Sequence, residues 1–207
     1  MSLNTSIECV LFDLDGTLID TAPDFIEVVN QLTTENSEAA VAPELIYQTV
    51  SDGARALVKL AFKIDEDHER FASLNQRLLD IYHQQLLNTR ASLYPGLAQL
   101  LEELEAAEIP WGIVTNKPEL YSLRLLENLG LLQSCKVLIC PDHVSERKPH
   151  PEPIFKACEM LNCSTERTVY LGDHIRDIQA AKNADVIAVA AAYGYLAPDT
   201  RVEEWYA

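Results

Sequence analysis

The sequence predicts an α/β protein built on a parallel sheet, with a group of helices inserted after the first strand. Two observations point to the sheet: short apolar runs recur along the chain, and segments with helical periodicity lie between them. A third observation points to the insertion, because about 70 residues after the first apolar run contain helical patterns and no convincing strand.

Five apolar runs are predicted to form strands. Each ends in polar residues or glycine, as expected of parallel strands buried on both faces, and they occupy residues 9–12, 111–114, 137–140, 169–171 and 186–190. Helical patterns lie between them: Leu97, Leu100, Leu101 and Leu104 recur at helical spacing, and residues 120–129 and 154–161 are similar. This alternation predicts helices on both faces of the sheet.

The inserted stretch carries three apolar stripes at helical spacing. Their members are Phe25, Val28, Val29 and Leu32, then Leu57, Val58, Leu60 and Ala61, then Phe71, Leu74, Leu78, Ile81 and Tyr82. Tyr94-Pro95-Gly96 marks the return to the sheet. We therefore predict a small helical domain at 20–90 and a core domain formed by 1–19 and 91–207.

The charge balance excludes several classes of partner. Sixteen Lys and Arg residues face 32 Asp and Glu residues, which gives a formal net charge of −16. A broad basic surface for nucleic acid or an anionic membrane is therefore not expected, and an anionic ligand must be held locally. No apolar run approaches the ~20 residues that span a bilayer, and no signal-like segment opens the chain, so the predicted location is the cytoplasm.

The cysteines do not suggest a disulfide framework. The chain has five, an odd number with irregular spacing, and we expect reduced, mostly buried thiols. The two C-x4-C spacings are wider than the pairs that usually hold zinc, so a metal role for these residues is the weaker interpretation.

Two carboxylates follow the first predicted strand, in the segment Val10-Leu11-Phe12-Asp13-Leu14-Asp15-Gly16-Thr17-Leu18. Because side chains alternate along an extended chain, Asp13 and Asp15 point the same way and share one small site. Gly16 permits a sharp turn, and the Thr17 hydroxyl can hold a carboxylate. Taken alone, the segment is also compatible with an ordinary acidic turn at a strand end.

Three more polar segments follow other predicted strands. They are Thr115-Asn116-Lys117-Pro118, Lys148-Pro149 and Gly172-Asp173-His174-Ile175-Arg176-Asp177. In open α/β sheets the ligand site lies beyond the carboxyl ends of the strands, so all four segments are expected to converge. Lys148 taken alone would be a surface lysine and Thr115 a strand-end cap; the combination makes both candidate site residues.

The four segments in this order resemble the motifs of haloacid dehalogenase superfamily phosphatases, and the resemblance covers nearly the whole chain. It implies a Rossmann-like core with an α-helical cap inserted after the first motif, which matches the 20–90 stretch. It also implies Mg²⁺ and an aspartyl-phosphate intermediate. One departure lies at the end, where relatives continue beyond the position of Ala207 into a last strand and helix.

The resemblance implies a role for each acidic residue. Asp13 is the expected nucleophile and gives Mg²⁺ a carboxylate, while Asp173 gives a second carboxylate. Asp15 contributes its backbone carbonyl to the metal and acts as general acid and then general base, with nearby negative charge favouring its protonated form. Asp177 falls one helical turn after Asp173 and is expected to support the metal site or Lys148 without binding substrate. The alternative is an ordinary acid in the first turn of a helix, where it complements the helix dipole.

The remaining site residues are expected to bind the phosphoryl group and the substrate. Thr115 donates its hydroxyl to a phosphoryl oxygen, with Asn116 beside it, and Lys148 supplies a fixed positive charge to the phosphate and to Asp13. Arg55, after the flexible Gly53, is proposed to bind a carboxylate on the non-reacting part of the substrate. An arginine that only faces solvent at a helix start is an equal alternative.

The substrate is expected to be a small phosphorylated metabolite. The overall pattern resembles phosphoglycolate phosphatases, whereas residues 53–56, 111–118, 139–144 and 193–195 look closer to phosphatases of N-acetylmuramic acid 6-phosphate. Both substrates carry a carboxylate besides the phosphate monoester.

Two other functions share parts of this pattern. A phosphomutase of the same superfamily would need a second phosphate-binding site in the cap, where only scattered cations such as Lys59 and Lys63 accompany Arg55. A non-catalytic phosphorelay receiver also combines acidic residues, Mg²⁺, a Thr and a Lys. Receivers lack the Asp15 partner and an insertion of this length.

Overall fold

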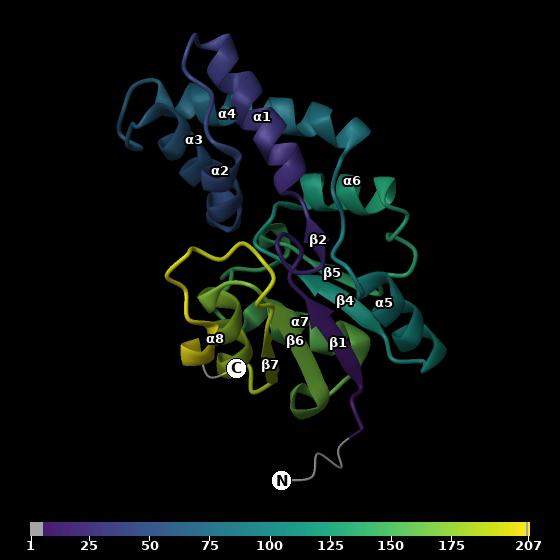
Figure 1. Cartoon of the computed structure of the whole chain (residues 1–207). Helices are drawn as coiled ribbons and strands as arrows, with labels where there is room; N and C mark the ends of the chain where they lie inside the picture. Colours follow the sequence, from purple (N-terminus) through teal and green to yellow (C-terminus); the bar gives the residue numbers. More distant parts are fainter. Residues whose placement is uncertain (1–5, 206) are drawn as a thin grey trace.

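The computed structural model describes residues 6–205 and 207, so the predicted core range 1–19 begins outside the described residues. Five strands form one parallel sheet in the order β5-β4-β1-β6-β7 (Figure 1). Their bounds are β1 Cys9–Phe12, β4 Trp111–Val114, β5 Val137–Ile139, β6 Thr168–Gly172 and β7 Ile187–Ala190. The predicted α/β fold with a parallel sheet is confirmed.

The strand bounds differ from the prediction by at most one residue at an end. β1 and β4 have the predicted bounds, whereas β5 ends at Ile139, β6 includes Thr168 and Gly172, and β7 begins at Ile187. A strand ends where its ladder of hydrogen bonds to neighbours ends, and apolar character alone does not mark that point.

Side chains of β1 alternate between two apolar cores. Val10 and Phe12 pack on the face that carries α5 (Leu97–Ala106) and α6 (Glu119–Asn128). Cys9 and Leu11 pack on the opposite face with α7 (Glu152–Leu161) and α8 (Ile175–Asn183). Helices therefore cover both faces, and the site must lie at an end of the sheet.

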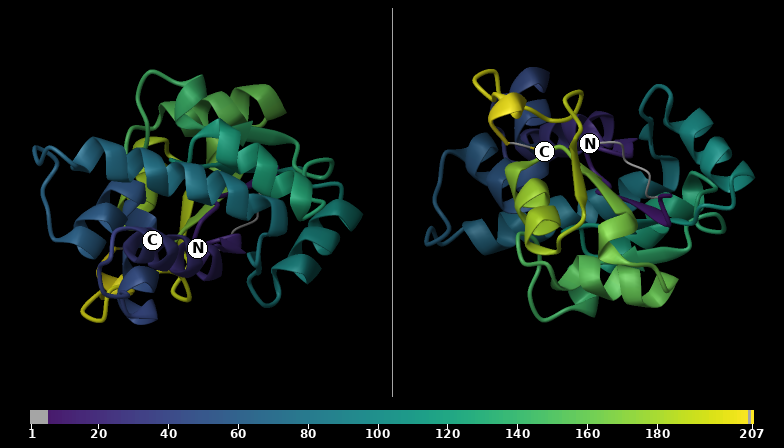
Figure 2. Two further views of the ribbon diagram at one scale, coloured as in Figure 1. Left: turned by 90° about the horizontal axis from the view of Figure 1, so that it is seen from above. Right: turned by 90° about the horizontal axis from the view of Figure 1, so that it is seen from below.

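Four helices follow β1 and form a group beside the carboxyl ends of the strands (Figure 1). They are α1 Ala22–Glu35, α2 Pro43–Thr49, α3 Ala54–Phe62 and α4 Phe71–Gln85, with the short 3-10 helix η1 Val50–Asp52 between α2 and α3. Viewed from above, these helices lie in front of much of the sheet (Figure 2). All residues of the predicted first and third stripes are buried, along with Leu57 and Val58 of the second. In the described part of the chain, no helix is long and apolar enough to cross a membrane.

A short antiparallel ladder joins the two connections between the helical group and the sheet. It pairs β2 (Ile19–Asp20) with β3 (Ser92–Leu93), and it was not predicted because two-residue strands show no alternation. Next to the ladder, the buried Asp24 carboxylate on α1 accepts hydrogen bonds from the Arg90 amide at 2.7 Å and from the Thr89 hydroxyl. The chain entering the group is thus fastened to the chain leaving it.

Candidate active site

The four polar segments converge at the carboxyl ends of the strands, as predicted. Asp13 follows β1, Thr115 follows β4 and Asp173 follows β6, while Lys148 comes from the loop between β5 and α7. β1 lies between β4 and β6 in the sheet, so Asp13 stands at the centre of the group.

The Lys148 ammonium forms ion pairs with two of the carboxylates. Its Nζ lies 2.9 Å from Asp13 Oδ1 and 2.7 Å from Asp177 Oδ1, and its side chain is fully buried. It also donates to the backbone carbonyl of Val114 at 2.9 Å and to the Tyr170 hydroxyl at 2.7 Å. Burial alone would lower the pKa of Lys148, but the two carboxylates outweigh burial and raise it. The ammonium is therefore a fixed positive charge.

Three acids lie close enough to share one cation. Asp13, Asp173 and Asp177 are buried, and one oxygen from each lies within 4.8 Å of the others. Burial, followed by the charges of Asp13 and Asp177, raises the pKa of Asp173 to about 7. Three carboxylates against one ammonium leave negative charge uncompensated, and carboxylate oxygens are the donors that Mg²⁺ prefers. The residues therefore fit a divalent cation.

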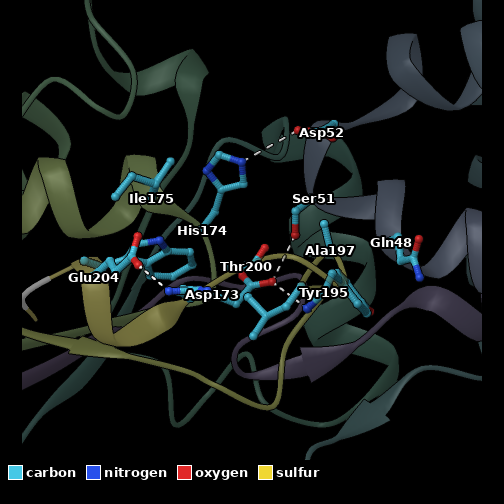
Figure 3. Close-up of a pocket in the computed structure, with 13 residues that line it drawn as sticks. Gln48, Ser51, Asp52, Asp173, His174, Ile175, Tyr195, Ala197, Thr200 and Glu204 are labelled. Atoms are coloured by element: carbon cyan, nitrogen blue, oxygen red, sulfur yellow. Dashed lines mark hydrogen bonds and ion pairs between the residues drawn. The ribbon is translucent and has the colours of Figure 1, made fainter.

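Asp173 is oriented from three directions. The Ser51 hydroxyl at 3.0 Å and the Tyr195 amide at 2.9 Å donate to Oδ2 (Figure 3). The Thr17 hydroxyl donates to Oδ1 at 3.1 Å. Asp177 is held by the His174 amide, which donates to its Oδ2 at 3.0 Å at the start of α8. These donors fix the carboxylates before any ligand is present.

Asp15 belongs to a neighbouring group of contacts. Its Oδ1 accepts from Lys117 Nζ at 2.8 Å and from the Thr21 hydroxyl at 2.6 Å. Gly16, at φ +83°, turns the chain directly after it. Burial alone would lower the pKa of Lys117, but the charge of Asp15 raises it. The second acid therefore has its own cation.

Thr115 and Asn116 directly follow the carboxyl end of β4. Thr115 is buried, and its hydroxyl oxygen accepts from the Lys117 amide at 3.1 Å. Asn116 Nδ2 donates to the backbone carbonyl of Lys148 at 3.1 Å, which ties the end of β4 to the loop that carries the lysine. The buried Asn116 Oδ1 has no hydrogen-bond partner among the described residues.

Arg55 is not brought to this group. Its guanidinium forms an ion pair with Glu66 and lies 5.4 Å from the centroid of the Phe71 ring, and its side chain is 61% exposed. In this arrangement its contacts lie within the helical group. The predicted contact with substrate therefore has no support from the geometry.

Three residues in the site were absent from the sequence-based set. Lys117 is adjacent to the predicted Asn116 and could have been suspected because it follows a strand end directly. Ser51 lies just outside the 53–56 stretch singled out in the sequence, and Tyr195 appears there only as part of the 193–195 stretch. Neither carries a signal in the sequence that would place it against Asp173, because each reaches that residue from a distant segment.

A cavity of about 310 Å³ opens beside Asp173, between η1, the start of α8 and the C-terminal segment (Figure 3). At its edge His174 Nε2 lies 3.7 Å from Asp52 Oδ1, and Arg176 donates to the backbone carbonyl of Ser51. The helical group therefore contacts the core beside the acidic cluster.

Comparison with known proteins agrees with this geometry. Residues 10–191 match the model of the haloacid dehalogenase-like hydrolase family. The chain is 39% identical over 199 residues to an N-acetylmuramic acid 6-phosphate phosphatase of Pseudomonas putida, covering 96% of this chain and 89% of the relative. It is 40% identical over 198 residues to a phosphoglycolate phosphatase of Xanthomonas campestris pv. campestris, with the same two coverages.

Solved structures agree as well. The crystal structure of a predicted phosphoglycolate phosphatase from Haemophilus somnus superposes with a TM-score of 0.85 at 25% identity. The superposition covers 98% of this chain and 92% of that one.

Proposed function

The chain belongs to the haloacid dehalogenase-like hydrolase family and is a phosphatase, and from that premise we propose that it hydrolyses a small phosphate monoester through an aspartyl phosphate on Asp13. The observation that carries the proposal is the contact of Asp13 with the buried Lys148 ammonium, 2.9 Å away, inside a cluster of acids. An attacking carboxylate is repelled by a phosphate dianion unless cations lie beside both.

The hydrogen bonds of Asp13 support its role as nucleophile. Lys148 Nζ and the Leu14 amide, at 2.7 Å, both approach Oδ1. Within residues 6–205 no donor approaches Oδ2, so this oxygen is available to attack phosphorus in line. The bond to phosphorus forms as the bond to the leaving oxygen breaks.

Asp13, Asp173 and the backbone carbonyl of Asp15 are proposed to hold Mg²⁺. When bound, the ion neutralises charge on the phosphoryl oxygens. Asp177 serves mainly to orient Lys148, because its Oδ1 lies 2.7 Å from the ammonium. The requirement for Mg²⁺ is part of the proposal.

Asp15 is proposed to protonate the leaving alkoxide and then to take a proton from the attacking water. Thr115 is proposed to donate its hydroxyl to a phosphoryl oxygen, with Asn116 beside it and Lys148 supplying positive charge. The 20–90 stretch is proposed to act as a cap domain, since its η1 segment already contacts Asp173 through Ser51. The cytoplasmic location stays a prediction.

We propose a phosphoglycolate-like substrate, with N-acetylmuramic acid 6-phosphate as the second candidate. The similarity to relatives named for the two substrates is nearly equal, at 40% and 39% identity, which favours neither. The second candidate is retained because the local stretches that resemble its phosphatases include 193–195, and Tyr195 of that stretch contacts Asp173.

The test is phosphate release from both esters by the purified protein with Mg²⁺, compared with Asp13→Asn. We expect the substitution to abolish release, a loss of at least about 10³-fold, while the thermal midpoint changes little because the side chains have nearly the same size. Asp67→Asn, an exposed acid in the helical region, is the matched control and should keep full activity.

Three outcomes would contradict the proposal. Activity persisting in Asp13→Asn would refute the nucleophile. A stable phosphoprotein without turnover would favour the receiver alternative. Isomerisation of a monophosphate that needs a bisphosphate activator and releases no phosphate would favour the phosphomutase.

A further inference from the structure

Lys117 is a buried cation whose position the proposed reaction does not explain. It follows the β4 strand by three residues, and its side chain is only 6% exposed. Moving an ammonium group out of water costs several kcal/mol unless it finds charged or polar partners. A lysine retained in such a place must therefore have specific partners.

Its charged partner is Asp15, and the contact is to one oxygen only. Lys117 Nζ at 2.8 Å and the Thr21 hydroxyl at 2.6 Å both approach Asp15 Oδ1. No hydrogen bond reaches Oδ2 from any residue in the described part of the chain. The two donors come from distant parts of the chain. Lys117 belongs to the core domain, and Thr21 directly precedes the first helix of the helical group.

Two rings from the helical group cover the ammonium. Its Nζ lies 5.1 Å from the centroid of Phe25 on α1 and 4.6 Å from that of Tyr82 on α4. The rings stack on each other with centroids 4.3 Å apart. Ring faces attract a cation, and the two rings shield the ammonium from water, while the Asp15 side chain stays 16% exposed.

We propose that Lys117 is a positioning residue for Asp15, fixing Oδ1 so that Oδ2 faces the leaving oxygen of the ester and, after taking up a proton from solvent, donates it there. This inference rests on the proposed function. As Asp13 forms its bond to phosphorus, the bond from phosphorus to the leaving oxygen breaks and the proton moves from Asp15 Oδ2 to that oxygen. Without the ammonium only the Thr21 hydroxyl holds Oδ1, so the carboxyl group is less tightly fixed and Oδ2 can turn away from the substrate.

A leaving-group comparison tests the inference. An alkoxide needs a proton to leave, as in phosphoglycolate, whereas p-nitrophenolate leaves well without one. The kcat/KM value reports the transfer to Asp13, so it is measured for phosphoglycolate and for p-nitrophenyl phosphate in wild type, Lys117→Met and Lys117→Gln. N-acetylmuramic acid 6-phosphate replaces phosphoglycolate if wild type acts only on that ester.

We expect Lys117→Met to lower kcat/KM for the alkyl ester about ten-fold or more and to lower the p-nitrophenyl value several times less. The loss for the alkyl ester should fall mainly on kcat. Lys117→Gln, whose amide can still donate to Asp15, should lie between Lys117→Met and wild type. Lys136→Met is the matched control, because it removes an exposed lysine and should change neither value.

A double-mutant cycle separates positioning from a general structural effect. If Lys117 acts through Asp15, adding Lys117→Met to Asp15→Asn should cause no further loss with p-nitrophenyl phosphate. Circular dichroism and thermal midpoints of each variant show that it is folded.

Several results would overturn the inference. Equal losses with both esters, or additive losses in the cycle, would show that Lys117 supports the fold and not Asp15. A higher KM for the alkyl ester alone, with kcat unchanged, would make Lys117 a binding residue for the substrate's carboxylate. Wild-type protein that releases phosphate from neither alkyl ester nor from p-nitrophenyl phosphate would overturn the proposed function, and the role of Lys117 with it.

Discussion

Asp173 shows how one side chain links the acidity of the site to its affinity for a cation. In the folded protein its pKa is raised to about 7 by burial and by the negative charges of Asp13 and Asp177. In the unfolded chain the same carboxyl titrates near 3.8. Between these values the folded state keeps a proton that the unfolded state has released, so the metal-free fold loses stability as pH rises from about 4 through 7.

In the proposed role of Asp173 as a Mg²⁺ ligand, the ion and this proton would compete for the same carboxylate, which gives a pH-dependent prediction. Below pH 7, each further fall of one pH unit should weaken Mg²⁺ binding up to about ten-fold, or about 1.4 kcal/mol. Addition of about 5 mM Mg²⁺ should therefore raise the thermal midpoint of unfolding more at pH 8 than at pH 6. An equal rise at both pH values in wild type would refute the linkage, and Asp173→Asn should show little rise at either.

Some site residues could be predicted from local sequence, whereas others depend on partners that lie far away along the chain. Asp13, Asp173 and Lys148 were found because each follows a strand whose carboxyl end is predictable. Lys117 was missed although it sits in a predicted segment, because its burial depends on rings of α1 and α4 that no local pattern places there. Arg55 was expected at the substrate because it is a cation after the flexible Gly53; here it pairs with Glu66, and its contact with substrate stays a prediction.

At the scale of elements, the segment after β7 acts as a brace across the first loop of the site. The Tyr193 hydroxyl donates to the backbone carbonyl of Thr17 at 3.0 Å, and the Tyr195 hydroxyl accepts from the Ala22 amide at 2.8 Å. Between the two tyrosines, Gly194 packs against Asp173 and the Gly16 carbonyl with no room for a Cβ atom. The C-terminal segment therefore helps to set the distance between Asp173 and the loop after Asp13.

Gly194→Ala should disturb this brace. A Cβ at this position overlaps the Cβ of Asp173 and the backbone oxygen of Gly16, so the segment must move away. We expect a loss of about 1–3 kcal/mol in the free energy of unfolding by urea, together with a fall in kcat. Gly130→Ala is the control: its φ of +70° makes an alanine strained, but nothing lies within 4 Å, so stability should fall and kcat should not. Unchanged kcat in Gly194→Ala would contradict the role of the brace.

Most elements were predictable because their signals are local. The strand at Trp111–Val114 is a run of apolar residues, and the α4 helix carries its whole buried stripe in its own sequence. The β2–β3 ladder was not predictable, because two residues give no period and the pairing of Ile19 with Leu93 spans the entire helical group. The contact of η1 with Asp173 is likewise a product of tertiary packing.

For the whole molecule, the net charge of −16 opposes the approach of an anionic ester, while the two site lysines are buried and act only at short range. Salt screens the long-range repulsion. We therefore expect kcat/KM at saturating Mg²⁺ to rise as KCl is increased from about 10 mM to about 150 mM, because the Debye length shortens from roughly 30 Å to 8 Å. A fall over this range would show that local attraction governs the encounter.

The central position of β1 in the sheet also determines when the site can form during translation. Translation produces Asp13 and Asp15 first, yet the strand that carries them needs β4 on one edge and β6 on the other. Lys148 and Asp173 leave the ribosome only after most of the polypeptide has been made. A nascent chain therefore holds Asp13, the proposed nucleophile, for most of synthesis without its Lys148 partner, and we expect no turnover until β6 has joined the sheet beside β1.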